Sequence, residues 1–291
     1  MTDGWNWVEK LPPRLEGQRR ALSRLLDFCE GSSTVTSLSV GCSLGRGAAD
    51  ELSDVDAAIG VAAPRGGAGA DHVRAVEEAL VDNLHQDDVV DVLRDESSTG
   101  DFFIRRVFAQ LRNGVQLDLA VIAEAEVRRG EAAPDFISLY RSSESAEEVA
   151  MPSAHEVTAD QVRAWTFLGW RSLLDADKYL RRSSPWEAHN RLHDARQHIW
   201  ALWATARRTA YPQHGLSQVL DQDPPTLPQG IEATVCGLDL EDLRATVLAT
   251  AAVLHDVSTA AAQRCAATLP TELAAYIRPI LSAGVEPEHL R

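Results

Sequence analysis

Short runs of apolar residues in the first half of the chain predict β-strands. β-Branched and aromatic residues dominate these runs, and turn-forming residues bound them. The runs lie at Val35 to Val40, Val55 to Val61, Val89 to Leu93, Phe103 to Leu111 and Val115 to Ile122. Arg112-Asn113-Gly114 separates the last two runs, and Asn-Gly predicts a tight hairpin there.

Apolar residues spaced three and four positions apart predict helices around these strands. One helical pattern follows Pro12-Pro13 as far as about Glu30, and a second runs from Asp71 to about Leu84. Pro134 to Tyr140 predicts a short helix, and the polar stretch Asp95 to Gly100 predicts a loop. Residues 1–150 are therefore expected to form a mixed sheet with flanking helices.

The second half of the chain has helical periodicity only. Helices are predicted at Ala159 to Arg182, Pro185 to Tyr211, Asp239 to Leu269 and Pro270 to about Leu281. The mostly polar stretch Ser142 to Ser153 marks a domain boundary. The predicted fold class is α+β, with a mixed-sheet domain at 1–150 and an antiparallel helical bundle at 151–291.

Three aspartates are candidate metal ligands. Asp54 and Asp56 are two residues apart at the start of a strand, so they share one face with Cα atoms about 6.6 Å apart. Two such carboxylates can bind a pair of Mg²⁺ ions. Asp118 is the only acid in its apolar run, and an unpaired carboxylate there is costly unless it binds a metal.

A glycine-rich turn precedes the two aspartates. Gly41 ends the first predicted strand, and Ser43, Gly45 and Gly47 follow it. Because glycine has no Cβ atom, the N–H groups of such a loop can approach an anion closely. The turn therefore predicts a phosphate-binding loop beside the metal site.

These residues resemble the nucleotidyltransferase superfamily that includes DNA polymerase beta and the antibiotic nucleotidyltransferases. Its signature is an apolar strand, a Gly-Ser turn, a spacer, Asp-apolar-Asp and a third acid on a later strand. Ser43 through Asp56 and then Asp118 match it, although Cys42 stands at the usual glycine position and Gly41 is one residue early. A catalytic domain followed by a helical one resembles the aminoglycoside and lincosamide nucleotidyltransferases.

The resemblance implies a set of site residues. Asp54, Asp56 and Asp118 would hold two Mg²⁺ ions, with ATP as co-substrate. Asp91, on an intervening strand, is the candidate base for the proton of the acceptor. The residues expected to bind the nucleotide are Gly41, Cys42, Ser43, Arg46, Lys178 and Arg182. For Lys178 and Arg182 a solvated, salt-bridged helix face is the open alternative.

The charge of the chain bears on its partners. The net charge is −15, from 28 basic and 43 acidic residues, which argues against a nucleic-acid partner because such binding relies on Lys and Arg. A cationic small acceptor is compatible with it. Residues 1–150 carry a net charge of −12, whereas 157–211 carry +4, which suits a triphosphate held between the two domains.

Cysteine usage and hydropathy bear on the compartment. The four cysteines are scattered and form no Cys-X-X-Cys pair, so neither a zinc site nor a disulfide framework is predicted. No apolar run approaches the roughly 20 residues that span a bilayer, and Met1 to Lys10 lacks the features of a secretion signal. A reducing cytoplasm and no membrane partner are expected.

The predicted activity is Mg-dependent transfer of a nucleoside monophosphate, AMP from ATP, to a hydroxyl of a small molecule, with release of pyrophosphate. An aminoglycoside-type antibiotic is the favoured acceptor, which would make the protein a resistance enzyme. A protein-modifying (AMPylating) enzyme, an antitoxin-type nucleotidyltransferase and a silent binding module remain alternatives. Arg191 and His198 also match the spacing found in helical RNases. Acceptor identity, nucleotide preference, modified position and oligomeric state stay open.

Overall fold

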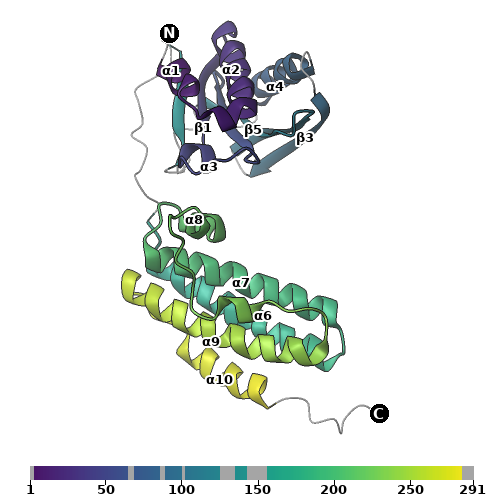
Figure 1. Ribbon diagram of the computed structural model, residues 1–291, viewed down its shortest axis with the longest axis vertical. Helices are drawn as coiled ribbons and strands as arrows, with labels where there is room; N and C mark the ends of the chain where they lie inside the picture. Colours follow the sequence, from purple (N-terminus) through teal and green to yellow (C-terminus); the bar gives the residue numbers. More distant parts are fainter. Residues whose placement is uncertain are drawn as a thin grey trace. The chain divides into compact units, whose positions relative to one another are not determined.

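The computed structural model describes residues 3–64, 69–85, 89–99, 102–124, 135–142 and 156–283. The chain forms two compact units, Met1–Ser153 and Ala154–Arg291 (Figure 1). The first contains a six-stranded mixed sheet with flanking helices, and the described part of the second is helical. This arrangement confirms the predicted α+β fold class.

One parallel strand pair lies inside an otherwise antiparallel sheet. The strand order is β3-β4-β5-β2-β1-β6. The strands are β1 (Val35–Val40), β2 (Val55–Val61), β3 (Val89–Thr99), β4 (Phe102–Leu111), β5 (Gln116–Ala123) and β6 (Ile137–Arg141). Among the described pairs, only β2 and β5 run parallel, which brings the starts of both strands to the same edge.

Two amphipathic helices, α2 (Glu16–Gly31) and α4 (Ala70–His85), pack on one face of this sheet (Figure 1). Strand residues alternate between faces, and the helix-covered face of β2 and β5 is fully apolar. Its buried residues are Val55, Ala57, Ile59, Val61, Leu117, Leu119, Val121 and Ala123. Asp56 and Asp118 occupy intervening positions and are half-buried on the opposite face.

The N-terminal residues form a helix that the sequence analysis missed. Helix α1 (Asp3–Glu9) lies against β6, where a Cβ atom on Gly4 would lie 1.9 Å from the main-chain oxygen of Leu139. A glycine at this position therefore lets the helix approach the edge strand closely.

Two local predictions in this unit are wrong. Pro134 to Tyr140 was predicted as a helix, but Ile137–Arg141 forms β6, because pairing with β1 overrides the local pattern. Asp95 to Gly100 was predicted as a loop, but β3 continues to Thr99. There Asp95 and Glu96 pair in register with basic residues of β4, which stabilises the extended hairpin.

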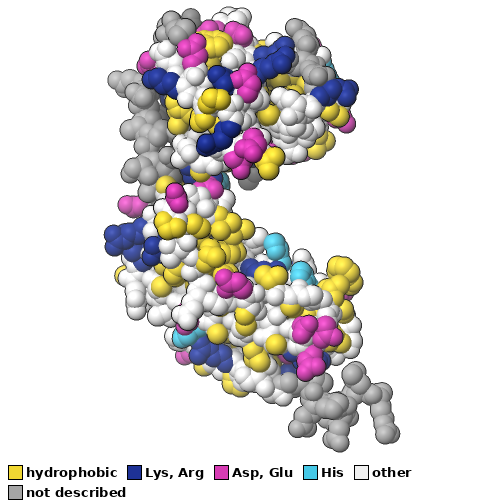
Figure 2. All heavy atoms as spheres, viewed as in Figure 1, with side chains coloured by type: hydrophobic (Ala, Val, Ile, Leu, Met, Phe, Trp, Pro, Cys, Tyr) yellow, Lys and Arg dark blue, Asp and Glu magenta, His cyan; other side chains and the backbone are white. Residues whose placement is uncertain are grey.

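The helical unit is built from four longer helices and a long connection. The helices are α6 (Ala159–Arg181), α7 (Pro185–Arg207), α9 (Leu240–Cys265) and α10 (Thr271–Ser282), and the connection carries the short α8 (Leu216–Leu220). Thr158 and Gln161 form a complete capping box at the start of α6. Figure 2 shows hydrophobic side chains gathered around α8, where Leu216 and Leu220 are exposed.

The helix directions differ from those of a simple up-and-down bundle. α6 and α7 are antiparallel across a short joint (Figure 1). Arg163 at the start of α6 donates to the carbonyl of Thr268, just after α9, at 3.0 Å. The start of α6 therefore lies near the end of α9, and α9 runs parallel to α7. The intervening connection returns along the bundle, where Trp203 donates to the Thr226 carbonyl at 2.6 Å.

Helix α9 combines 26 residues with a largely apolar composition. By length and composition it is sufficient to span a membrane, which the sequence analysis did not anticipate. In the structure 56% of its apolar window is buried inside the helical unit. The core helix of a globular domain has the same properties.

Candidate active site

Asp56 and Asp118 lie directly opposite each other in the parallel register of β2 and β5. Neighbouring strands are about 4.8 Å apart, so the two side chains extend side by side from the face opposite α2 and α4. Both residues are half-buried. The structure thus brings together two acids from separate strands of the predicted metal site.

Asp54 comes just before β2 and is exposed. It lines a pocket of about 490 Å³ together with Asp118 and Asp91, and the other walls come from β3, β4 and β5. Three acidic side chains therefore face one cavity at the edge where β2 and β5 begin.

A buried glutamine fixes the chain that leads to Asp54. Gln18 on α2 is 1% exposed, and its amide nitrogen donates to the carbonyls of Ser53, Glu51 and Asp50 at 2.8, 3.3 and 3.4 Å. No sequence pattern indicates this role, because a glutamine in an amphipathic helix is usually solvent-exposed.

The electrostatics of Asp56 are unfavourable without a cation. Burial raises the pKa of its carboxyl, and the neighbouring Asp118 and Asp54 raise it further. A thiol hydrogen bond from Cys42 and the positive charge of Arg46 act in the opposite direction. A divalent cation would relieve this repulsion between carboxylates.

The donor set fits magnesium, which prefers a few carboxylates together with substrate phosphates. In the described part of the chain, no three His, Cys, Asp or Glu side chains form a ready metal-binding cluster. Asp54, Asp56 and Asp118 would therefore have to rotate toward an ion, which their mutual repulsion opposes until the ion arrives.

The glycine-serine turn is helical rather than a loop. Cys42–Gly45 forms the short α3, and the N–H of Gly41 donates to the carbonyl of Asp56 at 2.9 Å. The turn is thereby tied to the strand that carries the acids. The amides of Cys42, Ser43 and Leu44 lie in the first turn of α3, where no carbonyl of the helix can accept from them. Phosphate contacts by Gly41, Cys42 and Ser43 stay a prediction.

Cys42 occupies an unusual backbone conformation. Its φ of +54° is left-handed, a region that glycine adopts without steric cost. This geometry gives a physical reason for the glycine found at this position in the family that the sequence resembles. Burial raises the pKa of the Cys42 thiol to about 12, so the group stays protonated and donates to Asp56.

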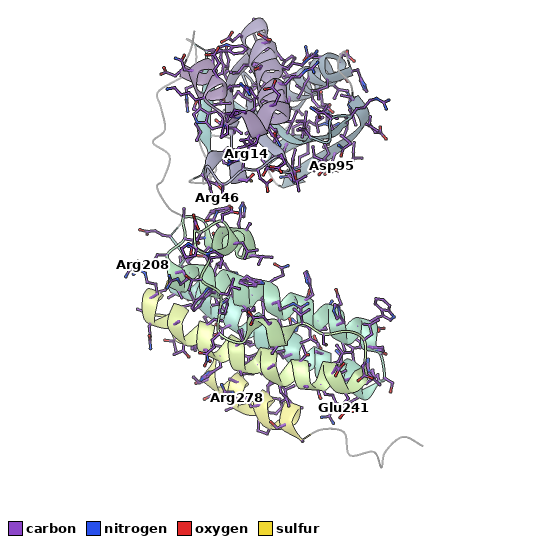
Figure 3. The ribbon with its side chains drawn as sticks, viewed as in Figure 1. Arg14, Arg46, Asp95, Arg208, Glu241 and Arg278 are labelled. Carbon is purple, nitrogen blue, oxygen red and sulfur yellow. The ribbon has the colours of Figure 1, made fainter. Side chains whose placement is uncertain are left out.

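Arg46 follows α3 (labelled in Figure 3). It forms an enclosed ion pair with Asp135. Its Nη1 lies 2.6 Å from Oδ2 of Asp135, and the two side chains are 15% and 2% exposed. Arg46 was predicted to bind the nucleotide, whereas Asp135 was not among the predicted site residues. The only signal at Asp135 was an acid inside a segment predicted to be helical.

Asp91, the predicted general base, lies on β3 and lines the same pocket as Asp54 and Asp118. β3 is two strands away from β5, a lateral separation of roughly 10 Å. Asp91 could therefore accept a proton only from an acceptor that lies across β4. Its role stays a prediction.

Lys178 and Arg182 belong to the helical unit. The Nζ of Lys178 lies 2.6 Å from Oδ1 of Asp175, and both cations lie over the Tyr179 ring, at 4.9 and 5.9 Å from its centroid. These contacts are typical of a solvated helix face, and binding of a triphosphate by either residue stays a prediction.

The RNase-type pair of α7 lies in the same unit. Arg191 forms an ion pair with Asp194 at 2.9 Å. Burial lowers the pKa of His198, and Asp194 opposes this shift. The two residues of the motif therefore have different surroundings, one charged and partly exposed, the other desolvated.

Comparisons with known proteins add little to this geometry. No protein-family model and no curated protein matches the chain. Among solved structures, the chain is similar to an aminoglycoside 6-adenyltransferase from Bacillus subtilis, with 13% sequence identity and a TM-score of 0.40. The match covers 90% of this chain and 96% of that chain. A likeness this distant carries no argument about function, so the proposal below depends on the site itself.

Proposed function

We propose that the protein transfers a nucleoside monophosphate, AMP from ATP, to a hydroxyl of a small acceptor and releases pyrophosphate. The observation that carries this proposal is the parallel register of Asp56 and Asp118, with Asp54 and Asp118 facing one pocket. An aminoglycoside-type acceptor is the favoured class, from the sequence resemblance and the acidity of that pocket.

The carboxylates have the properties of metal ligands. In the described part of the chain neither Asp54 nor Asp118 forms an ion pair, although both lie near the acidic Asp56. Two bound Mg²⁺ ions would neutralise charge on the α-phosphate and on the departing pyrophosphate. The three aspartates would hold them, and the turn at Ser43 would donate N–H groups to the outer phosphates.

The acceptor side of the pocket combines charge, hydrogen bonding and an apolar surface. Asp91 contributes a carboxylate, Phe108 a ring, and Gln110 and Gln116 amides that are joined by a 2.9 Å hydrogen bond. A hydroxylated cation fits this lining, because its charge meets carboxylates and its hydroxyls meet amides. Asp91 would accept the proton of the attacking hydroxyl, and Lys178 and Arg182 would hold the triphosphate.

A labelling experiment tests the proposal. The full chain is incubated with ATP labelled at the α-phosphate, Mg²⁺ and a panel of aminoglycosides, then of lincosamides. Label is expected in one or more antibiotics, with one pyrophosphate released per product and no reaction in EDTA. Asp71→Asn, at a fully solvated acid on α4, is the matched control and should react normally.

Other outcomes would contradict the proposal. Label that enters protein bands of a lysate, and no small molecule, would indicate a protein-modifying enzyme. Normal binding of Mg-ATP without pyrophosphate release from any acceptor would indicate a silent binding module.

A further inference from the structure

The segment that leads into β6 holds the α3 turn at three points. Oδ2 of Asp135 accepts a hydrogen bond from Nη1 of Arg46 at 2.6 Å. A Cβ atom on Gly45 would lie 1.8 Å from the main-chain oxygen of Asp135, and one on Gly41 would lie 2.4 Å from the Phe136 ring. The segment therefore packs against the turn with no room for a methyl group at either glycine.

Stability alone does not explain this ion pair. The Asp135 side chain is 2% exposed and that of Arg46 15%. Enclosing two opposite charges costs desolvation that their attraction hardly repays, so a buried ion pair contributes little net stability. Oδ1 of Asp135 is also buried, with no hydrogen-bond partner among the described residues. An arrangement with these costs points to a role beyond holding the fold together.

The ion pair is connected to the acidic side of the site. Arg46 is the residue at the end of α3. The same turn is joined to β2 through the hydrogen bond from the Gly41 N–H to the Asp56 carbonyl. A displacement of Arg46 would therefore change the position of the turn relative to Asp56.

We propose that Asp135 is a positioning residue of the nucleotide site. It holds Arg46, and with it the turn from Gly41 to Gly47, in place beside Asp56. The proposal rests on the function proposed above, in that the ligand is a magnesium–nucleotide complex. It gives Arg46 a different role from the direct phosphate contact that the sequence predicts.

The two roles of Arg46 predict opposite effects when Asp135 is neutralised. If Arg46 only supplied positive charge to a triphosphate, Asp135→Asn would remove a competing negative charge and tighten binding. If Asp135 positions the turn, the same change weakens binding, by roughly tenfold or more, as for the loss of other partners that orient ligand-binding groups.

A matched pair of variants separates positioning from general destabilisation. Glu77 on α4 is equally enclosed, at 2% exposed, and pairs with two arginines, Arg94 at 3.0 Å and Arg105 at 3.4 Å, on the helix-covered side of the sheet. Asp135→Asn and Glu77→Gln are made in the full chain. Calorimetry measures their affinity for Mg²⁺ with α,β-methylene-ATP, and amide hydrogen exchange reports on residues 41–47.

The expected result is weaker nucleotide binding and faster exchange at 41–47 in Asp135→Asn, with both unchanged in Glu77→Gln. Equal or tighter binding by Asp135→Asn, or equal weakening in both variants, would overturn the proposal. If Asp135→Asn does not fold, Arg46→Lys replaces it, because it keeps the charge but loses the guanidinium geometry. Weaker binding by Arg46→Lys supports positioning, and unchanged binding overturns it.

A different measurement tests the proposed function independently of the role of Asp135. If the wild-type chain binds no nucleotide, the function proposed above is wrong, whatever Asp135 does. Hydrogen exchange at 41–47 in Asp135→Asn, compared with Glu77→Gln, then decides whether Asp135 holds the turn. Unchanged exchange there would overturn the positioning role too.

Discussion

Two carboxylate pairings lie on either side of the α3 turn, and they differ in charge. Asp135 meets the guanidinium of Arg46 at 2.6 Å inside the protein. Asp56 instead meets a second acid, Asp118, across the parallel strands. The first pairing is electrostatically complete within the protein, whereas the second is not.

The Asp135–Arg46 pair is suited to a structural role, and the Asp56–Asp118 pair is suited to binding a ligand. A complete pairing holds its neighbours in place and needs no further ligand. An incomplete one leaves negative charge uncompensated at the expense of stability, and functional sites are where proteins commonly break the rules of folding. Substitutions at the two pairings should therefore have different effects on activity and on stability.

Asp56→Asn and Asp118→Asn should each lower turnover by about a thousandfold. Each removes a carboxylate that we propose as a metal ligand, and metal ions supply several kcal/mol of transition-state stabilisation. The same changes remove repulsion between carboxylates, so the free energy of unfolding should stay constant or rise by less than about 1 kcal/mol. Steady-state kinetics and urea unfolding measure the two effects. Normal turnover by either variant would show that the pair is not a metal site.

Arg46→Met should lower the free energy of unfolding, unlike Asp56→Asn and Asp118→Asn. It leaves the carboxylate of Asp135 enclosed without its partner, which costs about 3–5 kcal/mol of unfolding free energy. Because a hydrophobic pair of similar volume avoids this cost, Arg46→Met combined with Asp135→Leu should recover most of the loss. Urea unfolding checks both variants. A single variant as stable as the wild type would mean that the pair is solvated in solution.

Cys42→Ala should shift the pH dependence of activity. The Cys42 thiol donates to Asp56 and lowers the pKa of that carboxyl, so its loss raises this pKa further. More Asp56 is then protonated at a given acidic pH, and the acid limb of the kcat/KM profile moves to higher pH. Cys42→Ser keeps a hydrogen-bond donor and must adopt the same left-handed backbone conformation, so its pH profile should stay near that of the wild type. Identical profiles for Cys42→Ala and wild type would contradict the role of the hydrogen bond.

Lys178→Ala should have the smallest effect on stability. Its ion pair with Asp175 is largely solvated, so the free energy of unfolding should change by less than about 1 kcal/mol. If Lys178 holds the triphosphate, KM for ATP rises while the melting temperature stays constant. Arg191→Ala, which removes a similar surface ion pair on α7, is the control. Equal KM values for both variants and wild type would leave Lys178 as part of a solvated helix face.

The local sequence pattern predicted the acidic residues of the site, but it did not predict the residues that hold them in position. Strand alternation and spacing are properties of a few consecutive residues, so Asp56 and Asp118 could be placed on strands from the sequence. Asp54, predicted to begin the same strand as Asp56, lies just before β2 in the structure. Gln18 and Asp135 act on residues 32 or more positions away, through contacts that exist only in the folded chain. β6 was mistaken for a helix for the same reason, because its identity depends on pairing with β1.

Because β2 pairs in parallel with β5, the two strands that carry Asp56 and Asp118 are separate from the hairpin that forms the far walls of the pocket. The chain between these strands forms α4 and the β3–β4 hairpin, and that hairpin supplies the far walls of the pocket, including Asp91 and Phe108. Changes in hairpin length or composition would remodel the space for a ligand while the corner at Asp56 and Asp118 kept its register. An exchange of this hairpin would therefore alter which ligand the pocket admits and leave the two paired acids in place.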